Sequence, residues 1–200
     1  MPLPADLLLA LILYAFVSSI TPGPNNLMLL ASGVNFGFRR TIPHMMGIGG
    51  GFTLMVALVG LGLAGLFTLW PPLRWVLSVA SVAYLLWLAW KIAHAAPPRA
   101  EAAAEGKPLT LTQAAAFQWV NPKAWSMALT ACTLYAPAAD GPSVAAVALV
   151  FGAVNLPCVS SWAALGTFLR GWLRDPFRLR LFNGTMALLL VATLWPVFRG

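Results

Sequence analysis

Long runs of apolar residues alternate with short polar connections along this chain. A helix needs about 20 apolar residues to cross a hydrocarbon core about 30 Å thick. Six segments have about that length: Ala5–Ala31, His44–Leu69, Leu73–Ala93, Leu111–Tyr135, Ser143–Leu169 and Leu179–Phe198. The pattern predicts an all-α, polytopic membrane protein with six transmembrane helices in a single membrane domain over residues 1–200.

The first and fourth of these segments are interrupted by proline. The first holds Thr21-Pro22-Gly23-Pro24-Asn25-Asn26, and the fourth holds Asn121-Pro122-Lys123-Ala124-Trp125. Proline removes a backbone hydrogen bond from a helix interior and lipid supplies no replacement, so such a break is tolerated where the freed backbone lines a cavity. Broken helices at corresponding places in two halves of a chain indicate a transporter's substrate site.

The residues at each break predict where a second half-helix begins. Thr21 and Asn121 are side chains that cap helix N-termini, and Pro22 and Pro122 fit the first helical position. Counted from the start of its segment, Asn121 lies roughly 16 Å deep at about 1.5 Å per residue. Both half-helices are therefore predicted to begin near the middle of the membrane.

A polar stretch over residues 94–110 divides the chain into halves of three crossings each, residues 5–93 and 111–198. Its Pro97-Pro98 pair and its charged residues are typical of a linker. Because each half has an odd number of crossings, the second half enters the membrane in the opposite sense. This arrangement predicts a 3+3 inverted repeat.

Charge is scarce in this chain and unevenly placed. Hydrophobic residues make up 60% of the sequence and charged residues 8%, which excludes an ordinary soluble domain. Most basic residues fall in the connections after the first, third and fifth segments: Arg39, Arg40, Lys91, Arg99, Lys107, Arg170, Arg174, Arg178 and Arg180. Arg74 and Arg199 fall on the opposite side. Because Lys and Arg gather in cytoplasmic loops, where they also meet anionic membrane lipids, both termini are predicted to lie outside.

The two breaks also predict a binding chemistry. Helix N-termini attract anions through free N–H groups and the helix dipole, and Lys123 adds a positive charge at the same depth. The carbonyl ends of the leading half-helices attract cations, so the combination suits a zwitterion such as an amino acid. The residues expected to contact substrate or hold the broken backbone are Thr21, Gly23, Asn25, Asn26, Asn121, Lys123 and Asn155, with Pro22, Pro24, Pro122 and Pro157 as helix breaks.

Several of these residues also have plainer interpretations. A single proline is usually a kink that neighbouring helices accommodate, and Lys123 could extend to the cytoplasmic interface instead. His44 is predicted to lie at that interface. Trp119 and Trp125 suit a cavity wall and ordinary packing equally well, and the glycines of residues 47–51 predict close helix packing.

The chain resembles the LysE/RhtB family of bacterial amino-acid exporters over nearly its whole length. The resemblance rests on the proline motif of the first segment and the Arg39-Arg40 pair after it, the glycine-bearing second segment, and Trp119-Val120-Asn121-Pro122-Lys123-Ala124-Trp125. It implies a secondary transporter of the inner membrane that exports amino acids or close derivatives, driven by the proton gradient. The resemblance is also compatible with a homodimer.

One position departs from the family pattern. Many relatives carry Asp directly after Thr-Pro-Gly-Pro, where this chain has Asn25, and no Asp or Glu lies deep in any segment. The chain therefore offers no obvious carboxylate to carry a proton. By elimination, the substrate itself, Lys123 or His44 would do so.

Other function classes fit the sequence less well. A metal-cation exporter needs carboxylate, imidazole or thiolate ligands, and Lys123 would repel the cation. An enzyme needs a nucleophile with a base, or paired thiols, whereas Cys132 and Cys158 match no such motif and read as core residues. A non-transporting scaffold would not need polar helix breaks in the middle of the membrane. The basic loops are explained by membrane topology, so they do not indicate nucleic-acid binding. We expect no catalysis, cofactor or metal.

Overall fold

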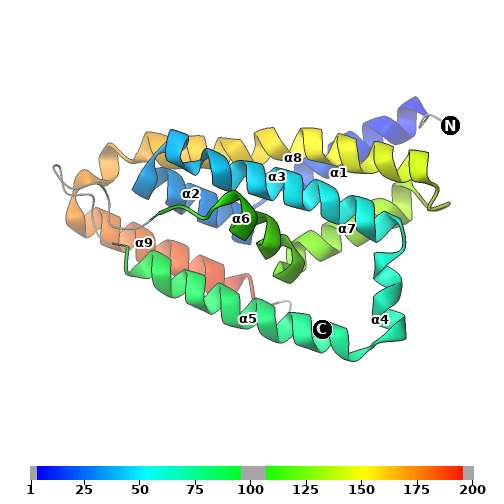
Figure 1. Cartoon of the computed structure of the whole chain (residues 1–200). Coiled ribbons are helices and arrows are strands. Elements are labelled where there is room, and N and C mark those ends of the chain that lie inside the picture. Colours follow the sequence, from blue (N-terminus) through cyan, green and yellow to red (C-terminus); the bar gives the residue numbers. More distant parts are fainter. Residues whose placement is uncertain (1–3, 96–106, 196–200) are drawn as a thin grey trace.

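The computed structural model describes residues 4–95 and 107–195. Helices account for nearly all of the secondary structure there (Figure 1). The α-helices are α1 (Ala5–Ile20), α2 (Pro24–Phe36), α3 (Phe38–Gly60), α4 (Leu66–Leu69), α5 (Pro72–Ala93), α6 (Leu111–Phe117), α7 (Pro122–Tyr135), α8 (Gly141–Leu169) and α9 (Pro176–Ala192). Short 3-10 turns cover Leu63–Gly65, Gln118–Val120 and Trp172–Arg174. Most of the predicted linker, residues 96–106, lies outside the described residues.

Three helices in the described part of the chain, α3, α5 and α8, are long and apolar enough to cross a membrane. The pair α1 and α2 makes up to a fourth span if the two are taken as one bent crossing. The other described α-helices are shorter: α4 has 4 residues, α6 has 7, α7 has 14 and α9 has 17. The protein is thus an all-α, polytopic membrane protein, while the count of six crossings stays a prediction.

The bounds predicted for the second segment are wrong at both ends. Instead of covering 44–69, α3 begins at Phe38 and ends at Gly60. Gly37 has a φ of 80° and Gly62 a φ of 105°, a region that glycine enters without a steric penalty. Gly37 lets the chain reverse directly from α2 into α3, and Gly62 ends the long helix before the short α4.

The chain leaves α-helical geometry at both proline motifs. α1 ends at Ile20 and α2 begins at Pro24, with an angle of 55° between them. The predicted cap is wrong by two residues here, because Gly23, not Thr21, precedes the helix. The residue before a proline is pushed into extended backbone, so Pro24 keeps Gly23 extended and prevents a helix from starting at Pro22.

At the second motif the chain follows the predicted pattern. α6 runs into the turn Gln118–Val120, and α7 begins at Pro122. Asn121 is the cap, and its side-chain oxygen accepts a hydrogen bond from the Lys123 amide at 3.2 Å. With one proline instead of two, nothing moves the helix start beyond the first helical position.

The expectation that Pro157 breaks the fifth segment is wrong. α8 runs without interruption from Gly141 to Leu169, with Pro157 inside it. A single proline removes one backbone hydrogen bond, which a long helix packed on several neighbours tolerates. The two motifs that do end a helix have a capping residue or a second proline beside the first.

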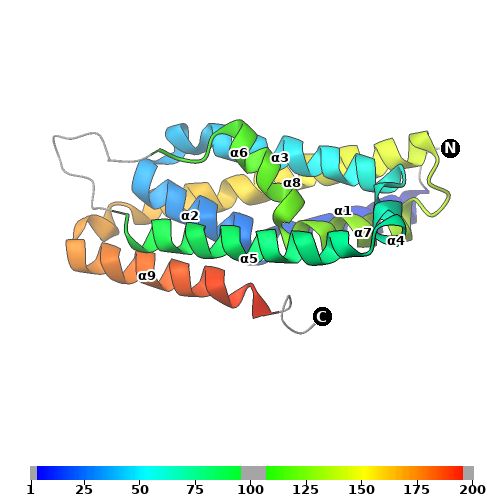
Figure 2. The ribbon, with the colours of Figure 1, turned by 60° about the horizontal axis from the view of Figure 1, so that its bottom comes forward.

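The helices pack in a reciprocal pattern. α1 and α2, from the first half, lie against α8 of the second half, and α6 and α7 lie against α3 of the first half. α3 and α8 contact each other, and α5 lies beside α9 in both views (Figures 1 and 2). Each broken helix is therefore held by the long helix of the opposite half.

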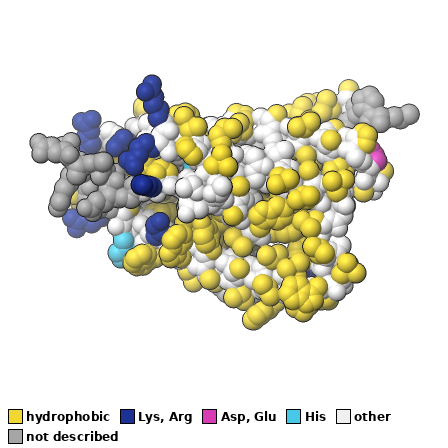
Figure 3. Space-filling view, in the orientation of Figure 1, with side chains coloured by type: hydrophobic (Ala, Val, Ile, Leu, Met, Phe, Trp, Pro, Cys, Tyr) yellow, Lys and Arg dark blue, Asp and Glu magenta, His cyan; other side chains and the backbone are white. Residues whose placement is uncertain are grey.

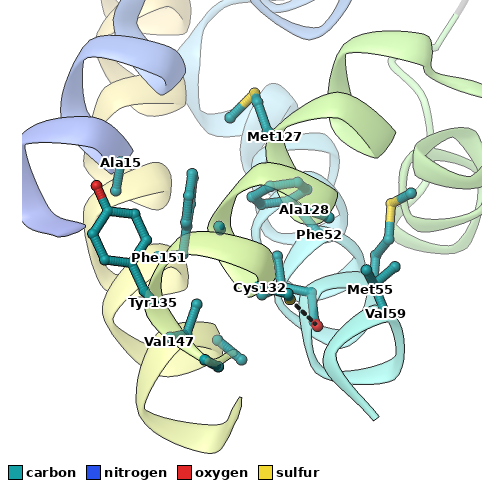
Figure 4. Packing of buried hydrophobic residues seen from close by; sticks show 14 of the residues in the cluster. Ala15, Phe52, Met55, Val59, Met127, Ala128, Cys132, Tyr135, Val147 and Phe151 are labelled. Carbon is teal, nitrogen blue, oxygen red and sulfur yellow. Dashed lines mark hydrogen bonds between the residues drawn. The ribbon is translucent and has the colours of Figure 1, made fainter. Parts of the chain in front are cut away.

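The largest apolar cluster lies where α1, α3, α7 and α8 meet (Figure 4). Phe52 and Phe151 pack edge to face with ring centroids 5.1 Å apart. Cys132 lies in this cluster and donates a weak hydrogen bond to the Val56 carbonyl at 3.4 Å. Both cysteines are free and buried, in line with their interpretation as core residues. This cluster anchors the elements that carry the two breaks.

Glycine allows the closest helix contacts. A Cβ on Gly47 or Gly51 would collide with the backbone of α6, while one on Gly50 would meet open space. Gly33 of α2 and Gly166 of α8 face each other's helix in the same way. The predicted small-residue packing is therefore present in α3, and a second instance joins α2 to α8.

Basic side chains gather at one end of the molecule (Figure 3). That end holds the α2–α3 turn, the end of α5 and the connection from α8 to α9 (Figure 1). The described N-terminus lies at the opposite end, and apolar side chains cover much of the surface between (Figures 1 and 3). We call the two ends the basic end and the N-terminal end.

Candidate functional site

A small cavity lies between the two helix breaks. Its walls come from the end of α1, the starts of α2 and α7, and one face each of α3 and α8. The polar lining residues are Ser18, Ser19, Asn25, Asn26, Asn121, Lys123 and Asn155. Its volume is about 20 Å³, space for about one water molecule, so an amino acid requires the helices to move apart.

Lys123 joins the two breaks across this cavity. Its Nζ donates to the Thr21 carbonyl at 2.7 Å, to the Thr21 hydroxyl at 3.0 Å and to the Pro22 carbonyl at 3.4 Å. These carbonyls lie just past the end of α1, where the helix dipole is negative. Lys123 thus points across the cavity to the other break. The site compensates the charge with backbone oxygens.

Gly23 leaves the space that this lysine fills. A Cβ at this position would lie 2.7 Å from Cδ and 3.1 Å from Nζ of Lys123. The backbone of Gly23 is extended, a conformation open to any residue, so close approach and not conformation explains the glycine. The two proline motifs are therefore complementary: one supplies a gap and carbonyls, and the other supplies the cation.

A second link between the breaks is a pair of side-chain amides. Asn25 donates to Gln118 Oε1 at 2.9 Å, and Gln118 donates back to Asn25 Oδ1 at 3.2 Å. Gln118 is fully buried and also donates to the Ala114 carbonyl at 2.9 Å. Its three hydrogen bonds fix the turn before α7 against the start of α2.

This amide pair makes a testable prediction. Replacing either Gln118 by Met or Asn25 by Leu leaves the partner amide unpaired, at a cost of about 1–3 kcal/mol. The double variant should lose less unfolding free energy than the two single variants together, with a coupling energy of about 0.5–3 kcal/mol. Unfolding of the wild type, the two single variants and the double variant in detergent measures this double-mutant cycle. Losses that add within about 0.5 kcal/mol would contradict the link.

Other polar side chains hold the broken backbone of α1. Asn26 donates to the carbonyls of Ser19 and Thr21, each at 2.8 Å. Trp162 of α8 donates to the Ile20 carbonyl at 3.1 Å. Asn155, also of α8, donates to the Ser19 hydroxyl at 3.0 Å. The carbonyl groups that a helix end leaves without partners are thus satisfied by side chains.

The first turns of α2 and α7 face the cavity. Asn25 and Asn26 belong to the first turn of α2, and Lys123 and Ala124 to that of α7; all four line the cavity. The first N–H groups of a helix have no intrahelical acceptor and carry the positive end of its dipole. The cavity therefore joins two anion-attracting helix starts to the cation-attracting end of α1.

The structure brings all seven predicted contact residues together. Six line the cavity, and the seventh, Thr21, holds the Lys123 ammonium at its edge. Sequence reasoning missed the side chains of Ser18, Ser19, Gln118 and Trp162. Gln118 had a usable signal, because it is a polar residue three positions before Asn121 in an apolar run.

His44 lies inside α3 and not at the start of its segment, and its predicted place at the membrane interface stays a prediction. It is buried with 2% exposure, and neither ring nitrogen has a hydrogen-bond partner in the described part of the chain. α3 begins six residues earlier than predicted, which moves His44 from the edge of the segment into the bundle. It lines a second cavity, at the basic end.

Trp119 and Trp125 line a third cavity on the other side of the second break. This groove of about 400 Å³ lies between α5 and α7 and also includes Arg74 and Pro122. The two rings contact each other, and the Trp125 Nε1–H donates to the Trp119 carbonyl at 2.9 Å. Both interpretations of these tryptophans, cavity wall and packing, therefore apply.

Broken helices around a polar cavity in an apolar bundle define a membrane transport protein more closely than any other class. The profile of the family described as LysE type translocator matches residues 16–193. The chain belongs to the LysE type translocator family. Its members are transporters and not enzymes.

Curated relatives support this assignment. The cysteine/O-acetylserine efflux protein of Escherichia coli (strain K12) is 33% identical over 185 residues, which cover 89% of this chain and 90% of the relative. The protein of the same description from Shigella flexneri has the same identity and coverage. No solved structure gives a significant match.

Proposed function

We propose that this protein exports small amino acids or close derivatives across the bacterial inner membrane, through the cavity between its two helix breaks. The observation that carries the proposal is the convergence of both proline motifs on one polar cavity, with Lys123 bridging them. The efflux proteins from Escherichia coli and Shigella support cysteine and O-acetylserine as the first substrates to test.

The cavity suits both charged groups of an amino acid. A substrate carboxylate would meet the Lys123 ammonium and the first N–H groups of α2 and α7. A substrate ammonium would take the carbonyls of Thr21 and Pro22, which Lys123 occupies in this closed state. Binding thus moves Lys123 from backbone oxygens to substrate. The same lysine repels a metal cation, which favours amino acids over the metal-export alternative.

We propose six crossings arranged as a 3+3 inverted repeat that works by alternating access. The reciprocal packing of each broken helix on the long helix of the other half supports a two-fold relation between the halves. Tilting of one half against the other would open the cavity to each side in turn. The basic end would face the cytoplasm and both termini the outside.

Coupling to the proton gradient is part of the proposal. Lys123 lines the central cavity and the buried His44 lines a second one, and these are the two side chains we propose as proton carriers. Collapse of an imposed pH gradient should then stop uphill transport in proteoliposomes. Uphill transport that survives the collapse would contradict the coupling.

A homodimer, which the family resemblance leaves open, is tested by light scattering in detergent.

Counterflow tests the function itself. Proteoliposomes preloaded with unlabelled cysteine or O-acetylserine should take up labelled cysteine transiently above its equilibrium level. Liposomes without protein control for leakage, and arginine and glutamate control for the class of substrate. Absence of counterflow for a panel of neutral amino acids and O-acetylserine would contradict the proposal.

A further inference from the structure

A second polar cavity lies at the basic end of the bundle, and the central site does not account for it. It has a volume of about 90 Å³ between α2, α3, the end of α5 and the segment before α6, several times the volume that one water occupies. Asn35 and His44 form its polar wall, and Lys91 and Lys107 line it as well.

Two side chains in the wall of this cavity carry buried polar atoms without a hydrogen-bond partner in the described part of the chain. The Asn35 amide uses its nitrogen on the Ala31 carbonyl at 2.8 Å and on Asn183 Oδ1 at 3.3 Å. Its Oδ1 is buried and has no partner in the described part of the chain, and the same holds for both ring nitrogens of His44. Buried polar atoms in proteins nearly always have partners, so a ligand or water is needed here.

The unpartnered atoms select the chemistry of that ligand. Asn35 Oδ1 is an acceptor, and a neutral imidazole offers one acceptor and one donor. A group with several N–H donors, such as an ammonium, satisfies the two acceptors, whereas a phosphate dianion supplies acceptors only. The side chains of Lys91 and Lys107 are exposed and attract a carboxylate. A zwitterion therefore matches both groups of side chains, with its ammonium at Asn35 and His44 and its carboxylate at the two lysines.

One face of α2 borders both this cavity and the central one. Asn25, Met28, Ser32 and Asn35 are three or four residues apart and so share a face of the helix. Asn25 lines the central cavity, and the other three line the second cavity. At about 1.5 Å per residue, Asn25 and Asn35 are about 15 Å apart. Met28 lies between them and has a flexible side chain.

We propose that the second cavity is a loading site, which binds the amino acid at the basic end before it passes along α2 to the central cavity. The ammonium is held by Asn35 and His44 and the carboxylate by Lys91 and Lys107. This inference rests on the proposed function, and it adds a second substrate site per chain.

The test uses labelled cysteine and purified Lys123→Ala protein, in which the central site is disabled. Equilibrium binding by this protein in detergent should persist, and adding His44→Asn should abolish it. His94 is exposed, so His94→Asn is the matched control and should leave binding unchanged. As a second measurement on exposed positions, Lys91→Gln with Lys107→Gln should raise the KM of transport from the basic end by about tenfold.

The outcomes separate the two ideas. Normal counterflow by the wild type, with no cysteine binding to the Lys123→Ala protein and an unchanged KM in the double lysine variant, overturns the loading site and leaves the export function. Competition by phosphatidylglycerol but not by unlabelled cysteine also overturns it, because the site then binds a lipid headgroup. Binding without any wild-type counterflow contradicts the export function and supports the site.

Discussion

Replacement of Lys123 by Ala is expected to lower export by about 100-fold or more without preventing insertion into the membrane. The lysine is the cation that faces the substrate carboxylate in the proposed cycle, and in the structure it donates hydrogen bonds to the Thr21 and Pro22 carbonyls. A hydrogen bond to a charged group contributes about 1.5–3 kcal/mol, and about 2.8 kcal/mol corresponds to 100-fold. Insertion should survive, because a central lysine costs about 2.5–3.5 kcal/mol on insertion scales.

Counterflow of labelled cysteine and protein yield from membranes measure both parts of this prediction. Lys123→Met keeps the apolar stem and separates loss of charge from loss of volume. Arg74→Ala removes a basic side chain outside the central cavity and should export normally. Wild-type rates in the Lys123→Ala protein would remove this residue from the mechanism.

Gly166→Ala is expected to destabilise the bundle, because an added Cβ would collide with the Leu30 carbonyl of α2. Overpacking of a close contact costs about 1–3 kcal/mol. In a protein of this size each kcal/mol lowers Tm by roughly 2–4 °C, so thermal unfolding in detergent should shift downward by several degrees. The effect reaches the site, since α2 carries the first break and α8 carries Asn155.

The same change at Gly184 provides the control for this prediction. A Cβ at Gly184, inside α9, meets open space. Alanine is the better helix former by about 0.5–1 kcal/mol, so Gly184→Ala should leave Tm unchanged or raise it. Equal shifts in the two variants would show that helix propensity, and not the α2–α8 contact, sets the result.

Much of the site could be predicted from the sequence because proline and capping residues act locally. Pro22, Pro24 and Pro122 restrict their own backbone and that of the residue before them, so the ends of α1 and the start of α7 follow from short motifs. Lys123 and the asparagines are polar residues in apolar runs. Their depth implied a shared cavity, and the structure places them around one.

The rest depends on contacts between distant parts of the chain, which no local pattern encodes. Gln118 gains its role by pairing with Asn25 across 93 positions. Pro157 resembles the other prolines in sequence, yet the packing of α8 keeps its helix continuous. The second segment was predicted to begin at His44, whereas α3 begins at Phe38. Gly37 allows the chain to reverse directly from α2 into α3, and the packing of these two helices determines how tight this turn is.

Thiol labelling of the central cavity tests the account most directly. Ala124→Cys, in a protein with Cys132 and Cys158 replaced by Ala, places a small reporter among the cavity-lining residues. Leu149→Cys, on the exposed apolar surface, serves as the control. A charged, membrane-impermeant reagent should modify position 124 in vesicles of either orientation, cysteine or O-acetylserine should protect it, and position 149 should stay unmodified. Failure to label position 124 from either side, or labelling that transported substrate leaves unchanged, would contradict a substrate path between the two breaks.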